Sequence, residues 1–116
     1  MSSSFDNADQ FTFSFEIGEN HALEDGFIRL PLRGHLDADG APVLTTALAA
    51  LLESGHTRVE LDCAEVHFIS STGIGSIVAA VGEYRDAGGD VVVRGLSEGL
   101  LGVFVSLDLL DYIVVR

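Results

Sequence analysis

The chain has 116 residues, of which 47% are apolar, and its 18 acidic and six basic residues give a formal net charge of −12. This length suits one domain, and the apolar content is sufficient for a buried core. The negative charge argues against anionic partners, both nucleic acid and an acidic membrane surface. Two interpretations remain: the negative charge serves only to keep the protein soluble, or the partner of this protein is another protein.

The lengths of the apolar runs, the N-terminal segment, the single cysteine and the histidines exclude further classes of protein. No apolar run approaches the ~20 residues that a membrane-crossing helix needs, and Met1–Gln10 lacks the basic and apolar regions of a signal peptide. We therefore expect a cytoplasmic protein, with a loose tail at residues 1–10 and one domain at residues 11–116. Cys63 has no partner for an internal disulfide, and its apolar phase predicts a buried thiol. The four histidines lack metal-ligand spacing, so we expect neither a metal nor a cofactor.

Two strands are predicted in the first third of the chain. Apolar and polar residues alternate over Phe11–Ile17 and again over Ile28–Leu32, which is typical of half-buried strands. Pro31 cannot donate a hydrogen bond, so it predicts a bulge or an unpaired point in the second strand. The turn residues Asp25 and Gly26 between the two strands favour a hairpin.

Helices and strands alternate over the rest of the chain. Apolar residues at helical spacing predict three amphipathic helices, around Leu44–Leu52, Ile74–Val81 and Leu100–Leu107. Apolar runs predict three more strands, at Arg58–Cys63, Val91–Val93 and Ile113–Val115. Asp39 or Gly40 is expected to cap the first helix and Ser97 the third. The order β-β-α-β-α-β-α-β predicts an α/β domain with a small mixed sheet of four or five strands, an opening hairpin followed by parallel strands.

The catalytic motifs that we considered fail on their residues. The chain has no lysine for a phosphate-binding loop, and the glycine pattern of a dinucleotide site breaks at Val78. Ser71, His67 and Asp37 supply the residue types of a hydroxyl–imidazole–carboxylate triad, but no nucleophile elbow surrounds the serine. The sequence therefore predicts a binding protein, with no enzymatic activity.

Three hydroxyl residues, Ser70, Ser71 and Thr72, stand between an apolar run and the second helix. A helix cap explains one of them. A helix N-terminus has unpaired N–H groups and a partial positive charge, so it tolerates a phosphoryl group. Phosphorylation would add about −1.5 to −2 charges and disturb a partner fitted to the neutral hydroxyl. The cluster is therefore a candidate switch.

The segment HFISSTGIGSIVAA resembles the signature of STAS domains, the anti-sigma factor antagonists of bacteria. GHLDADGAPVL at residues 34–44 resembles the family's second motif, and LSEGLLGVFVSLDLLDYIVV at residues 96–115 is similar to its C-terminal helix, loop and strand. The resemblance covers about residues 11–115. It implies a small mixed sheet with helices mainly on one side, and no catalysis.

The resemblance also implies partners and site residues. Family members bind an anti-sigma factor that is also a serine kinase and so release a sigma factor, and a PP2C-type phosphatase reverses the phosphorylation. By position, Ser71 is the implied acceptor, Ser70 stands where many members have Asp, and Thr72 is a second acceptor candidate and the expected helix cap. The expected partner-binding residues are Asp37, Asp39, Ser70, Ser71, Thr72, Gly73 and Ile74.

A second function stays open at this point. Some STAS domains are non-catalytic scaffold subunits of signalling or lipid-transport complexes, and the chain could be one of these. In either case its size and charge suit a monomer or a weak dimer.

Overall fold

The computed structural model describes residues 14–116. The predicted tail at residues 1–10 and the first part of the predicted strand, with Phe11 and Phe13, lie outside the described residues. The described elements, in chain order, are β1 (Phe15–Ile17), β2 (His21–Ala22), β3 (Ile28–Leu36), α1 (Gly40–Glu53), β4 (Arg58–Ile69), α2 (Ser71–Asp86), β5 (Asp90–Arg94), α3 (Glu98–Ser106) and the short 3-10 helix η2 (Leu109–Asp111).

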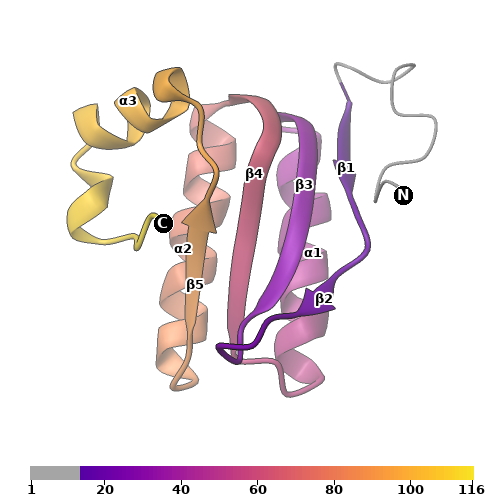
Figure 1. Ribbon diagram of the computed structural model, residues 1–116. Coiled ribbons are helices and arrows are strands. Elements are labelled where there is room, and N and C mark those ends of the chain that lie inside the picture. The colour runs from indigo at the N-terminus through magenta and orange to yellow at the C-terminus, as the bar shows by residue number, and fades with distance from the viewer. Residues whose placement is uncertain (1–13) are drawn as a thin grey trace.

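The strands form one five-stranded mixed sheet. Its order is β1-β3-β4-β5, and β2 pairs with β3 beyond the end of β1. β1 and β2 are antiparallel to β3, whereas β3, β4 and β5 are mutually parallel. Helices α1 and α2 lie side by side behind the sheet, and α3 lies beside the upper end of β5 (Figure 1). The predicted α/β class, with an opening antiparallel hairpin and then parallel strands, is confirmed.

β4 is twice as long as the predicted strand Arg58–Cys63. The prediction ends too early because two bulges interrupt the alternation of polar and apolar residues in β4. β3 pairs Pro31 with Asp62 and Arg33 with Glu65, so β4 has one residue more than β3 between these pairs. A second bulge of the same kind precedes Phe68. The first irregularity lies beside Pro31, where the sequence predicts one.

The core lies between the sheet and the helices α1 and α2. The strands contribute Leu30, Leu32, Leu36, Val59, Leu61, Cys63, Val66, Ile69, Val91 and Val93, and α1 and α2 contribute Leu44, Leu48, Ile74, Ile77, Val81 and Tyr84. α3 adds Leu100 and Phe104 at the edge of this core. The inward residues of β4 are two apart up to Cys63 and three apart after it, since each bulge adds one residue. The bulges thus keep β4 on the core over its full length.

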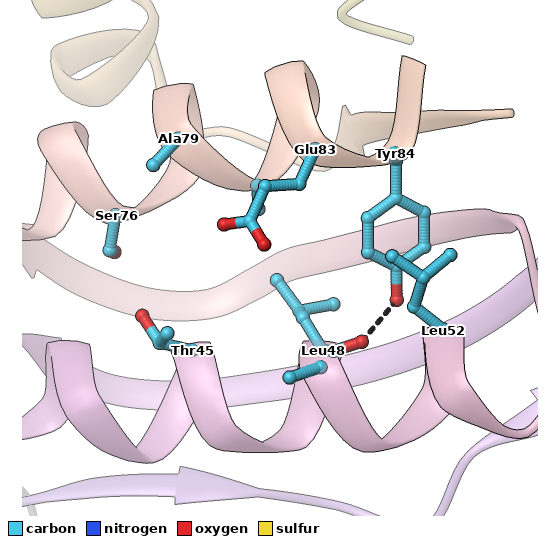
Figure 2. A pocket seen from close by; sticks show the side chains of 9 residues that line it. Thr45, Leu48, Leu52, Ser76, Ala79, Glu83 and Tyr84 are labelled. Carbon is cyan, nitrogen blue, oxygen red and sulfur yellow. Dashed lines mark hydrogen bonds between the residues drawn. The ribbon is translucent and has the colours of Figure 1, made fainter. Parts of the chain in front are cut away.

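α1 and α2 pack closely enough to share a hydrogen bond. The Tyr84 hydroxyl of α2 donates to the Leu48 carbonyl of α1 at 2.5 Å (Figure 2). Burial raises the pKa of Tyr84 to about 12, so this hydroxyl remains a donor at neutral pH. Beside it, Thr45, Ser76, Ala79 and other residues of the two helices line a cavity of about 30 Å³. This volume holds about two water molecules and is too small for an organic substrate.

The face of the sheet opposite the helices is stabilised by ion pairs. Glu60 of β4 is only 2% exposed, and its carboxylate accepts hydrogen bonds from Arg29 of β3 and from Arg116. Arg116 Nη2 also donates to Asp25 at 2.9 Å. A buried carboxylate is stable only when it is paired, so Glu60 ties the end of the chain to the sheet.

The C-terminal part of the chain corrects two predictions. The strand predicted at Ile113–Val115 is a single parallel bridge between Val93 and Val115, because Asp108 turns the chain with a φ of 57° and η2 follows before the chain returns to β5. α3 is not the amphipathic helix that the spacing predicts. Its core side consists of Leu100 and Phe104, whereas Leu107 follows the helix and is 54% exposed.

Candidate functional site

The candidate site lies where two neighbouring parallel strands end. β3 and β4 pair up to Leu36 and Ile69, so their carboxyl ends meet at the upper end of the sheet in Figure 1. The Ser70 N–H donates to the Leu36 carbonyl at 2.9 Å and fixes the start of α2 against the end of β3. Asp37 follows Leu36 directly, so the topology brings the segments that contain Asp37 and Ser70 together.

Ser70 is the N-cap of α2. Its backbone is extended, with φ −79° and ψ 171°, and its Oγ accepts a hydrogen bond from the Gly73 N–H at 3.1 Å. The expectation that one of the three hydroxyls caps the helix is confirmed, but the choice of Thr72 is wrong. Thr72 already lies inside α2, where the helical backbone does not allow N-cap geometry.

Ser71 and Thr72 occupy the first turn of α2, and both are exposed. Within residues 14–116, neither hydroxyl has a hydrogen-bond partner. The cluster therefore divides into one half-buried hydroxyl that caps the helix and two exposed hydroxyls that are accessible to another molecule. The roles predicted for Ser71 and Thr72 as acceptors stay predictions.

Asp37 and Asp39 lie at the start of α1, on the neighbouring strand end. Asp37 Oδ1 accepts hydrogen bonds from the N–H groups of Asp39 and Gly40, both at 3.1 Å. Asp39 thus holds the N-cap position, one of the two predicted, but Asp37 supplies the oxygen that accepts the hydrogen bonds. Asp39 has a helical backbone with φ −81° and ψ −34° and makes no cap hydrogen bond, so its exposed carboxylate is directed to solvent.

Gly73 and Ile74 are buried below the hydroxyl cluster. A β-carbon on Gly73 would lie only 2.9 Å from Leu36 Cγ and closer still to the Leu36 carbonyl oxygen, so only glycine allows this approach of α2 to β3. Ile74 is 8% exposed and belongs to the core. Both residues hold the start of α2 in place, and their predicted contact with a partner stays a prediction.

The electrostatics of the site depend on the N-terminus of α2, whose partial positive charge has no acidic residue of the same helix beside it. Its first turn contains no acidic residue, whereas α3 has Glu98 at its first position. The partial positive charge of a helix N-terminus is therefore not offset by a carboxylate of α2 itself. A negatively charged group on Ser71 would be stabilised by this helix end and would lie close to the segment that contains Asp37 and Asp39.

Two apolar side chains near the site are exposed, and they were not identified from the sequence. Phe68 belongs to the apolar run before Ser70, yet it is 47% exposed because the bulge before it turns it away from the core. Its ring packs against His35 with the centroids 5.6 Å apart. Val43 on α1 is 49% exposed beside Asp39, where the two line a common hollow. In the sequence, the exposed position of Val43 is indicated only by its place as an uncharged residue in the first turn of α1.

The other candidate chemistries have no geometric support. No hydrogen bond joins Ser71, His67 and Asp37 among the described residues. Burial raises the pKa of Cys63 to about 12, so the thiol is not a nucleophile at neutral pH. No group of three or more His, Cys, Asp or Glu within residues 14–116 could hold a metal ion. Over the same residues, no helix is both long and apolar enough to span a membrane.

Comparison with known proteins identifies the family. A family model described as "Mlab, STAS domain" matches residues 20–115. The anti-sigma-B factor antagonist of Listeria monocytogenes is 30% identical over 103 residues, which cover 89% of this chain and 88% of that protein. The protein of the same name from Bacillus subtilis is 31% identical over 86 residues, which cover 74% and 78%. The chain belongs to the STAS-domain family.

The solved structures agree on the fold. The crystal structure of an anti-sigma factor antagonist from Mycobacterium paratuberculosis superimposes with a TM-score of 0.76 over 89% of this chain and 86% of that one, at 17% identity. At this identity the likeness concerns the fold alone. The resemblance that the three sequence motifs carry is thereby confirmed at the level of the family and its fold.

Proposed function

We propose that this protein is a cytoplasmic anti-sigma factor antagonist. The surface around Ser70, Ser71 and Thr72 binds an anti-sigma factor that is also a serine kinase, and this binding releases a sigma factor for transcription. Phosphorylation of Ser71 ends the binding, and a PP2C-type phosphatase restores it. The protein acts by binding, as a monomer or weak dimer, and not by catalysis. The names of its Listeria and Bacillus relatives support this role.

The observation that carries the proposal is that the hydroxyls of the cluster have different roles: one caps α2, and the other two are exposed. Ser70 Oγ is committed to the Gly73 N–H, so a phosphoryl group on Ser70 would remove the cap of α2. Ser71 is exposed, has no partner within residues 14–116 and is the first residue of the helix. Modification of Ser71 therefore leaves the fold intact and changes only the surface.

The physical effect of the phosphate follows from its place. A phosphoryl group on Ser71 brings about −1.5 to −2 charges to a helix N-terminus that stabilises negative charge. Asp37 and Asp39, on the neighbouring strand end, repel it toward solvent and toward any bound partner. A partner surface that is complementary to a neutral serine then faces an unpaired charge, which costs several kcal/mol in the complex.

Phosphorylation of three proteins with the cognate kinase and ATP tests the proposal: the wild type, Ser71→Ala and Thr72→Ala. We expect phosphate on the wild type and on Thr72→Ala, and none on Ser71→Ala, as mapped by mass spectrometry. In a binding assay with the anti-sigma factor, Ser71→Asp should weaken binding by more than about tenfold, or about 1.4 kcal/mol. Ser71→Ala should bind like the wild type.

Two results would contradict the proposal. Phosphate on Ser71→Ala in wild-type amounts would move the acceptor to Thr72 or elsewhere. A wild type that an active cognate kinase leaves unmodified would favour the scaffold function, a subunit of a signalling or lipid-transport complex without a switch.

A further inference from the structure

The segment from Leu101 to Val114 exposes an unusual amount of apolar surface. Seven of its large apolar side chains are more than a third exposed, and we call them together the α3 surface: Leu101, Val103, Val105, Leu107, Leu110, Tyr112 and Val114. Within residues 14–116, only Val43 and Phe68 are comparably exposed elsewhere. Leu101, Leu110 and Val114 of this set line one hollow, so part of the exposed apolar surface is contiguous. Contiguous exposed apolar surface marks interaction sites, whereas single exposed side chains do not.

The helix itself indicates that a partner is missing. An ordinary surface helix is apolar on one side and polar on the other. α3 buries Leu100 and Phe104 on one side and exposes Leu101, Val103 and Val105 on the others, with Glu98 and Ser106 as its only polar side chains. A helix that is apolar all round is typical of a buried position, and α3 instead lies at the side of the sheet beyond β5 (Figure 1).

The α3 surface is hollowed as well as apolar. Leu101 of α3, Leu110 of η2 and Ile113, Val114 and Val115 line a common open hollow. The single bridge between Val93 and Val115 holds its floor against β5. A hollow of this kind can hold one apolar side chain of a partner. In many interfaces, a few such buried side chains supply most of the binding free energy.

The charges around the α3 surface decide what covers it. Glu98, Asp108 and Asp111 belong to the same segment, all three are exposed, and none has an ion-pair partner within residues 14–116. Every arginine of the chain is already engaged: Arg29 and Arg116 with Glu60, Arg85 with Asp90, Arg94 with Asp62, Arg58 with Phe27, and Arg33. A second copy has the same charge of −12 and no unengaged arginine, so it offers no cation to these acids.

We propose that the α3 surface is a second docking site, separate from the Ser70–Thr72 cluster, for an amphipathic helix of a partner protein. The apolar face of that helix covers Leu101, Leu110 and Val114, which line the hollow together. Lysine or arginine residues at its edges pair with Asp108 and Asp111. This binding mode, an amphipathic helix on an apolar groove, recurs among protein interfaces.

The test uses a defined probe: a helical peptide of Leu and Lys with all Leu on one face. Fluorescence anisotropy should detect binding to the full chain, and amide chemical shifts should change in residues 98–116 and not at Ser70–Thr72. Leu110→Ser with Val114→Ser should weaken binding by about tenfold or more, since two side chains that line the hollow are lost. The matched control, Val43→Ser with Phe68→Ser, removes side chains of similar exposure elsewhere and should change binding less than about twofold.

Two further comparisons sharpen the test. A peptide of the same pattern with Glu in place of Lys should not bind, and Asp108→Asn with Asp111→Asn should weaken binding of the Lys peptide several-fold. Asn tolerates the left-handed backbone of Asp108, so that variant keeps the fold. The experiment contains no kinase and no anti-sigma factor, so its outcome is independent of the proposed function.

Three outcomes would overturn the inference. Shift changes centred away from residues 98–116, or equal binding of the Glu peptide, would remove the site or its charge complementarity. A wild-type dimer in sedimentation equilibrium that Leu110→Ser with Val114→Ser dissociates would make a second copy the occupant. Binding to neutral lipid vesicles that the same double variant abolishes, without binding of the peptide, would make the surface a membrane contact.

Discussion

α2 and α3 begin with the same local structure but in different surroundings. In each, an extended serine accepts a hydrogen bond from the N–H three residues later: Ser70 from Gly73 at 3.1 Å, and Ser97 from Leu100 at 3.2 Å. α3 continues with Glu98, whereas α2 continues with Ser71 and has no acidic residue in its first turn. The serine cap is thus a property of both helices, and only the start of α2 combines it with a free hydroxyl and an unbalanced helix end.

The two helices also differ in how closely they approach the rest of the fold. α2 starts against the end of β3, and Gly73 allows that contact. Near the start of α3, a β-carbon on Gly99 would meet nothing within 4 Å. The start of α2 is therefore held by a close backbone contact with β3, as a site that presents a hydroxyl requires, whereas the start of α3 is held by its cap and by the buried Leu100.

The largest expected effect comes from Gly73→Ala. The added methyl group would overlap the Leu36 carbonyl, so the start of α2 must shift, and we expect a loss of about 2–3 kcal/mol in the free energy of unfolding. Urea unfolding followed by circular dichroism measures it. An unchanged unfolding midpoint would mean that α2 is not held against β3 as described.

The two caps should be equal in energy. Ser70→Ala and Ser97→Ala each remove one side-chain acceptor, so each should lower the free energy of unfolding by about 1 kcal/mol. Ser71→Ala, the matched control, should change it by less than about 0.5 kcal/mol, because Ser71 has no partner within residues 14–116. A loss for Ser71→Ala as large as for Ser70→Ala would contradict the division of labour in the cluster.

The open glycines should respond in the opposite direction to Gly73. Gly75 in α2 and Gly99 in α3 both have free space for a β-carbon. Alanine has the higher helix propensity, so Gly75→Ala and Gly99→Ala should each raise the free energy of unfolding by about 0.5–1 kcal/mol. Thermal unfolding measures both variants, and a decrease for either one would reveal a contact that the geometry does not contain.

The smallest effects concern the charges at the two helix starts. Ser71→Asp places a carboxylate at α2 and should stabilise the fold by about 0.3–1 kcal/mol, while Glu98→Gln removes one from α3 and should cost a similar amount. Both effects should shrink at about 1 M salt, where charges are screened within a few ångströms. If Ser71→Asp destabilised the fold instead, weaker anti-sigma factor binding by that variant would no longer report on the interface.

Local patterns in the sequence predict much of the fold. The alternation of polar and apolar residues indicates β3, and a continuous apolar run indicates β5. Helical spacing indicates α1 and α2, and Ser97 is correctly assigned as the cap of α3. These features depend on residues within a few positions of one another. For the same reason the hydroxyl cluster could be placed at a helix start before the structure was known.

The errors fall where distant parts of the chain meet. β4 continues to Ile69 because two bulges let it follow β3, and bulges do not appear as a regular period in the sequence. The choice of Thr72 over Ser70 as cap fails because the boundary of α2 depends on the hydrogen bond between Ser70 and Leu36. Phe68 and Leu107 look like core residues in the sequence, and only the sheet register and the turn at Asp108 expose them.

The class of fold and the position of three hydroxyls at the start of a helix can be inferred from the residues alone, and no known catalytic motif is found among them. These follow from hydrophobic periodicity, from residue types and from capping chemistry, all of which act over short distances along the chain. Which hydroxyl caps the helix and which are free depends on how α2 contacts β3, and this contact is visible only in the folded protein. The same holds for the α3 surface, since exposure is set by what the rest of the fold covers and leaves uncovered.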